Sequence, residues 1–150
     1  MSGDGAAAGA APAGRVAERQ IQVRWSDADP LGHVNNAVYL TYFEWARLQA
    51  WQSHVVGAEG ITAADATDPP LIVAEARVKY VSPANIGVPL AIEISVKEIR
   101  TKGFAFAYRV VAAADDRLVA EGETVIVAYD YNAARTMAIP PALRKALESM

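Results

Sequence analysis

The sequence predicts an α+β domain in which an antiparallel sheet wraps around one long central helix. One strand is followed by a single long helix, and four strands then follow in close succession as a meander. With 150 residues, 53% hydrophobic and 21% charged, the chain has the size and composition of one globular domain. A sheet around one helix leaves an edge and a face partly uncovered, so we expect a homodimer.

Residues 1–16 are expected to form a flexible tail before a single domain over residues 17–150. The tail is rich in Gly, Ala and Pro, and it lacks the basic start and large hydrophobic residues of a secretory signal. No later stretch approaches the roughly 20 apolar residues of a membrane span. The net charge of −3 without a basic run argues against nucleic acid, and the absence of cysteine fits the cytoplasm. We therefore expect a cytoplasmic protein that binds neither nucleic acid nor a membrane.

The first strand and the helix after it have clear periodic patterns. Residues 20–26 alternate apolar and polar side chains, which places Trp25 on the buried side of a strand. Residues 36–54 have the helical period and are apolar over most of the circumference, so we expect this helix to be buried. Asn35 or Asn36 suits its N-cap.

The second half of the chain reads as strands joined by turns. A short helical turn is expected at residues 62–66. Thr101-Lys102-Gly103 and Asp115-Asp116 are typical of hairpin turns, and a terminal helix is expected to begin at Pro140. The strands are predicted over residues 71–81, 90–100, 104–113 and 118–129.

Two aspartates, Asp27 and Asp29, lie in the turn before the long helix. Aspartate is common in turns, so one interpretation is that both only shape the chain. The other is that one carboxylate attacks a carbonyl group, or activates water against it, beside the unpaired N–H groups of the helix N-terminus. Because the chain has no cysteine, two histidines and no phosphate-binding glycine loop, we expect any catalytic chemistry in this turn.

His33 and Glu44 are the other candidates for acid–base chemistry. His33 suits a general base, a metal ligand with the two aspartates, or a packed turn residue. It lacks a second histidine at metal-binding spacing, so we expect no metal. Glu44 lies three residues before Arg47 on the expected helix and most simply forms an ion pair with it. A carboxylate facing a pocket is the catalytic alternative for Glu44.

The run WSDADPLGHVNNAVYLTYFEWAR resembles the hotdog-fold acyl-CoA thioesterases of the 4-hydroxybenzoyl-CoA thioesterase family. The family pattern is an aromatic residue, D-x-D-x-x-G-H-V-N-N-x-x-Y and a helical Y-F-E-x-A-R. The resemblance continues through LIVAEARVKYVSPANIGVPL, with its Y-x-x-P, and through LVAEGETVIVAYD. It covers about residues 19–148 and implies a hotdog fold. Many members have Gly-Asp after the Y-x-x-P strand, whereas here Gly87 precedes Val88.

The resemblance implies hydrolysis of an acyl-CoA or aroyl-CoA thioester to a carboxylic acid and free CoA, without a cofactor. It makes Asp29 the catalytic carboxylate, as nucleophile or general base, and Asp27 a supporting residue that shapes the turn. The backbone N–H around Asn36 would polarise the thioester carbonyl. The residues implied to line or brace the pocket are His33, Asn35, Asn36 and Tyr39.

The resemblance also has implications for CoA binding and for the assembly of several copies of the chain. The family's active site lies at a dimer interface, and tetramers made of two dimers are common. The basic side chains that could contact the CoA phosphates are Arg77, Lys79, Arg100 and Lys102. A solvated strand face and a hairpin tip explain these four residues equally well.

Two other functions are compatible with a hotdog domain. One is a non-catalytic acyl-CoA-binding or scaffold protein, because a fold does not fix a function. The other is a dehydratase, which the sequence favours less because its usual acid–base histidine is not evident. The sequence leaves open which acyl group is cleaved and whether the thiol is CoA or an acyl-carrier protein.

Overall fold

The computed structural model describes residues 15–150, and the predicted tail lies outside them except for its last two residues, which open the first strand. One 3-10 helix, Trp25–Asp27, precedes the long helix. The helices and strands are β1 (Arg15–Gln22), α1 (Val38–His54), α2 (Ala63–Thr67), β2 (Leu71–Tyr80), β3 (Pro89–Ile99), β4 (Gly103–Ala112), β5 (Leu118–Asp130), β6 (Arg135–Thr136) and α3 (Pro141–Glu148).

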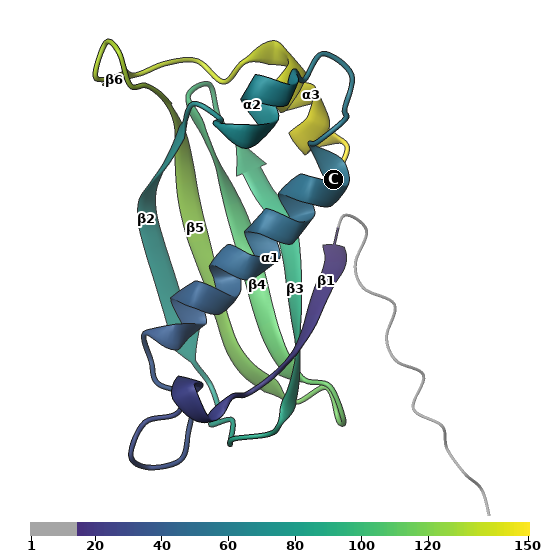
Figure 1. The fold of residues 1–150 in the computed structure, drawn as a ribbon, viewed down its shortest axis with the longest axis vertical. Coiled ribbons are helices and arrows are strands. Elements are labelled where there is room, and N and C mark those ends of the chain that lie inside the picture. Colours follow the sequence, from purple (N-terminus) through teal and green to yellow (C-terminus); the bar gives the residue numbers. More distant parts are fainter. Residues whose placement is uncertain (1–14) are drawn as a thin grey trace, which may run out of the picture.

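The sheet has the order β1-β3-β4-β5-β2, and every neighbouring pair is antiparallel. The short β6 pairs with the end of β5. Figure 1 shows the sheet curling behind α1, with α2 and α3 together at one end. The predicted α+β class, with one antiparallel sheet around one long helix, is confirmed.

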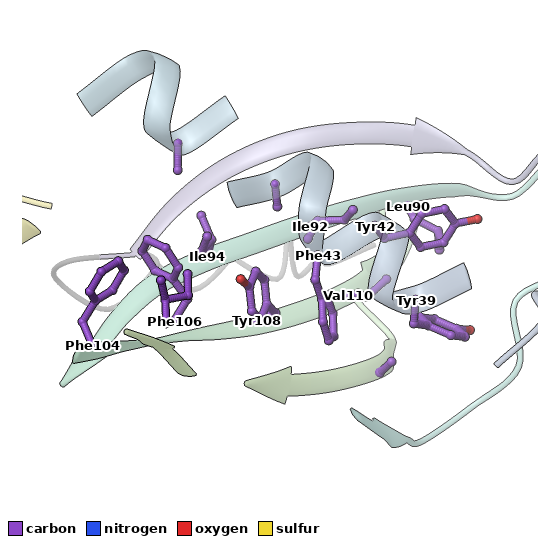
Figure 2. Packing of buried hydrophobic residues seen from close by; sticks show 14 of the residues in the cluster. Tyr39, Tyr42, Phe43, Leu90, Ile92, Ile94, Phe104, Phe106, Tyr108 and Val110 are labelled. Carbon is purple, nitrogen blue, oxygen red and sulfur yellow. The ribbon is translucent and has the colours of Figure 1, made fainter. Parts of the chain in front are cut away.

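The core lies between the inner face of the sheet and one side of α1 (Figure 2). The ring of Phe43 stacks on Tyr108 of β4, with 4.2 Å between ring centroids. A Cβ atom at Gly122 of β5 would lie 2.5 Å from Phe43 Cε2, so only glycine lets the helix come this close. The α1 side chains buried in this way are Tyr39, Tyr42, Phe43, Ala46 and Ala50.

The connection from β1 to α1 differs from its prediction. The expected strand over residues 20–26 ends at Gln22, and Trp25 is 83% exposed instead of buried. The backbone N–H of Arg24 donates to the carboxylate of Asp27 at 3.0 Å, and this local bond turns the chain out of the sheet. The N-cap of α1 is Ala37, not Asn35 or Asn36 as expected, and the Asn35 side chain accepts the Ala37 N–H at 3.0 Å just before the helix.

The expectation that α1 is buried all round is also wrong. Leu40 is 43% and Leu48 60% exposed, and they lie on the side of α1 that the sheet does not cover. The edge strand β2 is exposed along most of its length, including Val73 at 46%. A single sheet of this width encloses only part of one helix, so a strip between α1 and β2 stays open. No helix within residues 15–150 is long and apolar enough to cross a membrane.

Candidate active site

The carboxylate of Asp27 is buried and held by four groups. Arg24 donates from Nη2 at 2.8 Å, from Nε at 3.2 Å and from its backbone N–H, and the Tyr42 hydroxyl donates at 3.1 Å. Burial would raise the pKa of Asp27, but the hydrogen bonds from Arg24 and Tyr42 outweigh it and hold this pKa below its usual value. Burial and the neighbouring Asp27 charge raise the pKa of Tyr42. Asp27 therefore anchors the turn to α1.

Asp29, two residues later, is only partly buried and is held mainly by its own turn. Its Oδ1 accepts the Leu31 N–H at 2.9 Å. Its backbone N–H donates to the His33 carbonyl at 2.8 Å, and its carbonyl accepts from Gly32 at 3.0 Å. Gly32 has a φ of +82°, a conformation that side chains disfavour. These bonds leave Oδ2 of Asp29 without a partner in the described part of the chain.

The Asp29 turn is joined to the segment that follows β2. Val34 donates its N–H to the Ala84 carbonyl at 2.9 Å, and His33 and Asn85 form an antiparallel bridge. A cleft of about 340 Å³ opens between the two segments. Its lining residues are Asp29, His33, Val34, Asn36, Tyr39, Tyr80, Val81, Ser82 and Pro83.

The segment before α1 contributes Asn36 to the lining of this cleft. The carbonyl of Asn36 accepts the hydroxyl of Tyr80 at 2.9 Å. The N–H of Asn36 has no hydrogen-bond partner within residues 15–150. Asn35, which was also expected to line or brace the pocket, is not among the lining residues, and its N–H donates to the Asp27 carbonyl at 2.8 Å. An unpaired N–H at a helix start can stabilise a negative oxygen atom.

Tyr39 contributes a buried hydroxyl to the same cleft. Its ring meets Tyr80 edge to face, with 5.4 Å between centroids. Burial, and then the nearby Tyr80, raise the pKa of Tyr39 to about 12, against a lowering effect of Arg117. The hydroxyl is therefore neutral near pH 7 and can donate a hydrogen bond. It has no partner among the described residues.

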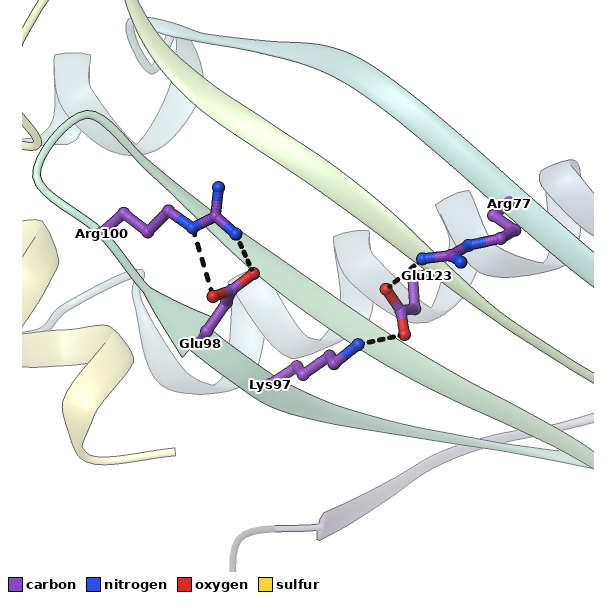
Figure 3. Close-up of polar contacts among 5 residues, drawn as sticks. All are labelled: Arg77, Lys97, Glu98, Arg100 and Glu123. Carbon is purple, nitrogen blue, oxygen red and sulfur yellow. Dashed lines mark hydrogen bonds and ion pairs between the residues drawn. The ribbon is translucent and has the colours of Figure 1, made fainter.

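The basic residues predicted to contact phosphates lie elsewhere. Arg77 and Lys79 of β2 pair with Glu123 at 3.0 Å and Glu121 at 3.8 Å. They alternate with Val78, whose partner Gly122 faces α1, so they point to the outer face of the sheet. Figure 3 shows the pair of Arg77 with Glu123, and Lys97 also pairs with this glutamate.

Arg100 and Lys102 lie at the hairpin between β3 and β4, at the opposite end of the sheet from the Asp29 turn (Figure 1). Arg100 pairs with Glu98 at 2.9 Å. Within the single chain, none of the four predicted phosphate contacts reaches the Asp29 cleft, and their role stays a prediction.

The expected ion pair between Glu44 and Arg47 is not formed among the described residues. Glu44 is exposed, whereas Arg47 reaches across to the Tyr108 hydroxyl at 3.4 Å. Arg47 also lines a second, largely apolar cleft of about 240 Å³ between α1 and β2. The side chains around it include Leu48, Trp51, Val73, Phe104 and Phe106. No group of three His, Asp or Glu side chains within residues 15–150 is arranged to hold a metal ion.

Sequence reasoning did not assign a role to the wall formed by Tyr80, Ser82 and Pro83, or to Arg117. Arg117 donates from Nη1 to the Pro83 carbonyl at 3.0 Å and to the Ser82 hydroxyl. The Y-x-x-P pattern at residues 80–83 was the available signal for the wall. No local pattern marks Arg117, since only strand register brings it there.

Comparison with known proteins relates this chain to thioesterases. The model of the thioesterase-like superfamily matches residues 23–147. The acyl-CoA thioester hydrolase YbgC of Escherichia coli is 25% identical over 82% of this chain and 89% of its own length. A Thermus thermophilus thioesterase complexed with coenzyme A and Zn is 28% identical, with a TM-score of 0.73 over 90% of this chain and 91% of that one.

A third match concerns the fold alone. A 1,4-dihydroxy-2-naphthoyl-CoA thioesterase from Synechocystis is 18% identical and has a TM-score of 0.77, over 91% of this chain and 98% of that one. The matches together confirm the hotdog fold and the thioesterase identification expected from the sequence. The chain belongs to the thioesterase-like superfamily.

Proposed function

We propose that this protein hydrolyses an acyl-CoA or aroyl-CoA thioester to a carboxylic acid and free CoA, with the carboxylate of Asp29 as nucleophile or general base. The observation that carries the proposal is the position of Asp29 in one cleft with the unpaired N–H of Asn36. A carboxylate and a donor for a developing oxyanion are the two groups that acyl transfer requires.

Asp29 can act by two routes that give the same products. As a nucleophile, Oδ2 attacks the thioester carbon, the thiolate leaves and takes a proton, and water then cleaves the mixed anhydride. As a general base, Oδ2 takes a proton from a water molecule, which attacks the same carbon and expels the thiolate. The Leu31 N–H on Oδ1 fixes the carboxylate, so that Oδ2 faces the reaction in either route. An acyl adduct on Asp29 after a rapid acid quench would select the first route.

The neighbouring residues fit supporting roles. The Asn36 N–H donates to the thioester oxygen as negative charge develops on it. The neutral hydroxyl of Tyr39 donates to the acyl group, because its pKa is raised to about 12 and the described chain offers it no partner. His33 braces the turn through its carbonyl, and Asp27 holds the turn against α1.

The comparisons support CoA as the thiol. The Escherichia coli relative is named an acyl-CoA thioester hydrolase, and the Thermus thermophilus relative is complexed with coenzyme A. A panel of short-chain, long-chain and aroyl-CoA substrates would rank the acyl groups.

The Asp29→Asn variant tests the proposal, with thiol release as the assay. Turnover should fall about 100- to 10,000-fold, because the amide neither attacks nor takes a proton at pH 7. Asp130→Asn is the matched control, since Asp130 accepts the Asn132 N–H at 2.9 Å in a similar turn outside the cleft. The control should keep wild-type turnover.

Two outcomes would contradict the proposal. Wild-type turnover in Asp29→Asn would remove Asp29 from the mechanism. Tight binding of acyl-CoA by the wild type, without turnover of any panel member, would favour the alternative of a non-catalytic acyl-CoA-binding or scaffold protein.

We also propose a homodimer that assembles into a homotetramer. The free edge of β2 supports it, since Ile72 is 40% and Val73 46% exposed beside unpaired backbone groups. Light scattering should give the mass of two or four chains, and Val73→Lys should shift it toward one. A wild-type mass of one chain would contradict the assembly. The cytoplasmic location expected from the sequence stays a prediction.

A further inference from the structure

Arg117 connects the turn between β4 and β5 to the wall of the Asp29 cleft. From Nη1 it donates to the Ser82 hydroxyl and, at 3.0 Å, to the Pro83 carbonyl. The Ser82 hydroxyl in turn donates to the Leu118 carbonyl at 2.6 Å. Because Ser82 and Pro83 line the cleft, the guanidinium group lies at its rim.

Much of this guanidinium group is still available for binding. A guanidinium carries five N–H donors, and the two bonds to the wall use only the pair on Nη1. The edge formed by Nε and Nη2 has no partner among residues 15–150, and Arg117 is exposed. This edge has the planar fork geometry that matches two oxygen atoms of a phosphate group.

The charges around Arg117 also differ from those around the other arginines considered as phosphate contacts. Arg77 and Arg100 each pair with a glutamate, at 3.0 Å and 2.9 Å. Arg117 forms no ion pair within the described chain, and its wall contacts are neutral oxygen atoms. The carboxylate of Asp115, on the same turn, accepts the backbone N–H of Arg117 at 3.1 Å. The guanidinium group of Arg117 therefore has no carboxylate within ion-pair distance among residues 15–150.

We propose that Arg117 binds a phosphate group of the thiol half of the substrate at the rim of the Asp29 cleft, through Nε and Nη2, while Nη1 holds the cleft wall. The inference rests on the proposed function, because it assigns the anchor of the same substrate. A phosphate held here leaves the reactive thioester free to extend toward Asp29 and Asn36. None of the four basic residues singled out by sequence lines this cleft.

The test compares two substrates that differ only in the phosphate-bearing part. Acyl-CoA carries phosphates, whereas the same acyl group on pantetheine carries none. In Arg117→Gln, KM for acyl-CoA should rise about tenfold or more with kcat nearly unchanged, because a charge-assisted pair is lost. KM for acyl-pantetheine should stay within about twofold. Arg117→Lys keeps the charge without the planar fork, so its KM for acyl-CoA should lie between those of the wild type and Arg117→Gln.

A matched arginine and a folding measurement complete the design. Arg135 of β6 is exposed and lies at the end of the sheet away from the cleft (Figure 1), so Arg135→Gln should leave both substrates unaffected. Urea unfolding of Arg117→Gln records any damage to the fold. An equal rise in KM for acyl-CoA and acyl-pantetheine would overturn phosphate binding. Arg117 would then act only through its contacts with the cleft wall. Unchanged KM values would overturn it as well.

The design separates this inference from the function on which it rests. If the wild type hydrolyses neither substrate, the proposed function fails on its own. Calorimetric titration with CoA and with pantetheine then still tests Arg117. CoA binding about tenfold weaker in Arg117→Gln would support the anion contact without catalysis, and unchanged CoA binding would overturn it.

Discussion

The two halves of the turn between β1 and α1 hold aspartates of opposite character. In the first half, Asp27 is 2% exposed, and its carboxylate accepts hydrogen bonds from Arg24 and Tyr42. In the second half, Asp29 is partly exposed, and its carboxylate accepts one hydrogen bond, from the backbone N–H of Leu31. The first carboxylate is saturated with donors, whereas the second keeps an oxygen atom available in a cleft.

The difference shows how one short turn can separate rigidity from reactivity. A carboxylate that is fully hydrogen bonded in the interior stabilises the fold and has no lone pair left for a substrate. Asp27 fixes the position of the chain at Arg24 and α1, and Asp29 depends on that position to reach the helix start. We therefore expect substitutions of Asp27 to change stability and those of Asp29 to change turnover.

The largest change in stability is expected for Asp27→Ala. It removes the acceptor for the Tyr42 hydroxyl and for three donors of Arg24, so the free energy of unfolding should fall by about 2–3 kcal/mol. Urea denaturation measures this difference. A loss below about 0.5 kcal/mol would show that the Asp27 anchor is dispensable, and would contradict the assignment of Asp27 as the structural aspartate of the turn.

The pH dependence of the same difference should follow from the lowered pKa of Asp27. The folded pKa lies below the unfolded value of about 3.9, so the contribution of Asp27 is present above that value. It is lost as the pH falls through the folded pKa. The gap in unfolding free energy between the wild type and Asp27→Ala should therefore be constant above about pH 5 and shrink below about pH 4. A gap that widens in acid would contradict this assignment.

A smaller effect is expected for Tyr42→Phe, which removes one of the donors to Asp27. The unfolding free energy should fall by about 1 kcal/mol, since a single buried hydrogen bond is lost and Arg24 still neutralises the carboxylate. Thermal denaturation gives the change. A loss as large as that of Asp27→Ala would mean that the tyrosine, and not the arginine, is the principal partner.

The smallest effect on stability is expected for Asp29→Asn, the variant with the largest expected effect on turnover. The amide oxygen can still accept the Leu31 N–H, so the unfolding free energy should stay within about 0.5 kcal/mol of the wild type. The same urea experiment measures it. A loss comparable to that of Asp27→Ala would make Asp29 a structural residue too. The reduced turnover of Asp29→Asn would then no longer be evidence for a catalytic role of Asp29.

The order of elements and one side of the cleft could be predicted from sequence. Apolar periodicity identifies the long helix and the four strands after it, because each element buries one face. The predicted meander of all four strands is wrong, because β2 pairs with β5 at the sheet edge and only β3, β4 and β5 follow one another as neighbours. The turn and the helix start are continuous in sequence, so Asp29, Asn36 and Tyr39 were expected together and do line one cleft. Their proposed roles in catalysis are still untested.

The other side of the cleft could not be predicted, because it depends on tertiary pairing. Tyr80 and Arg117 reach the cleft only through the register of β2 against β5. Trp25 was expected in a strand because its alternation continues there, but the bond between Arg24 and Asp27 redirects the chain. The exposed strip between α1 and β2 also depends on the width of the sheet, which no local pattern records.

The assembly of the cleft from distant segments has a consequence for folding. The bond between Tyr80 and Asn36 closes 44 residues, and the one between Arg117 and Ser82 closes 35. Contacts of such long sequence separation form slowly, because a large loop must close before any of them is made. During refolding, the helical circular dichroism of α1 should therefore recover before thiol release does. Catalytic activity would then report the completed chain topology, which the helix signal alone does not.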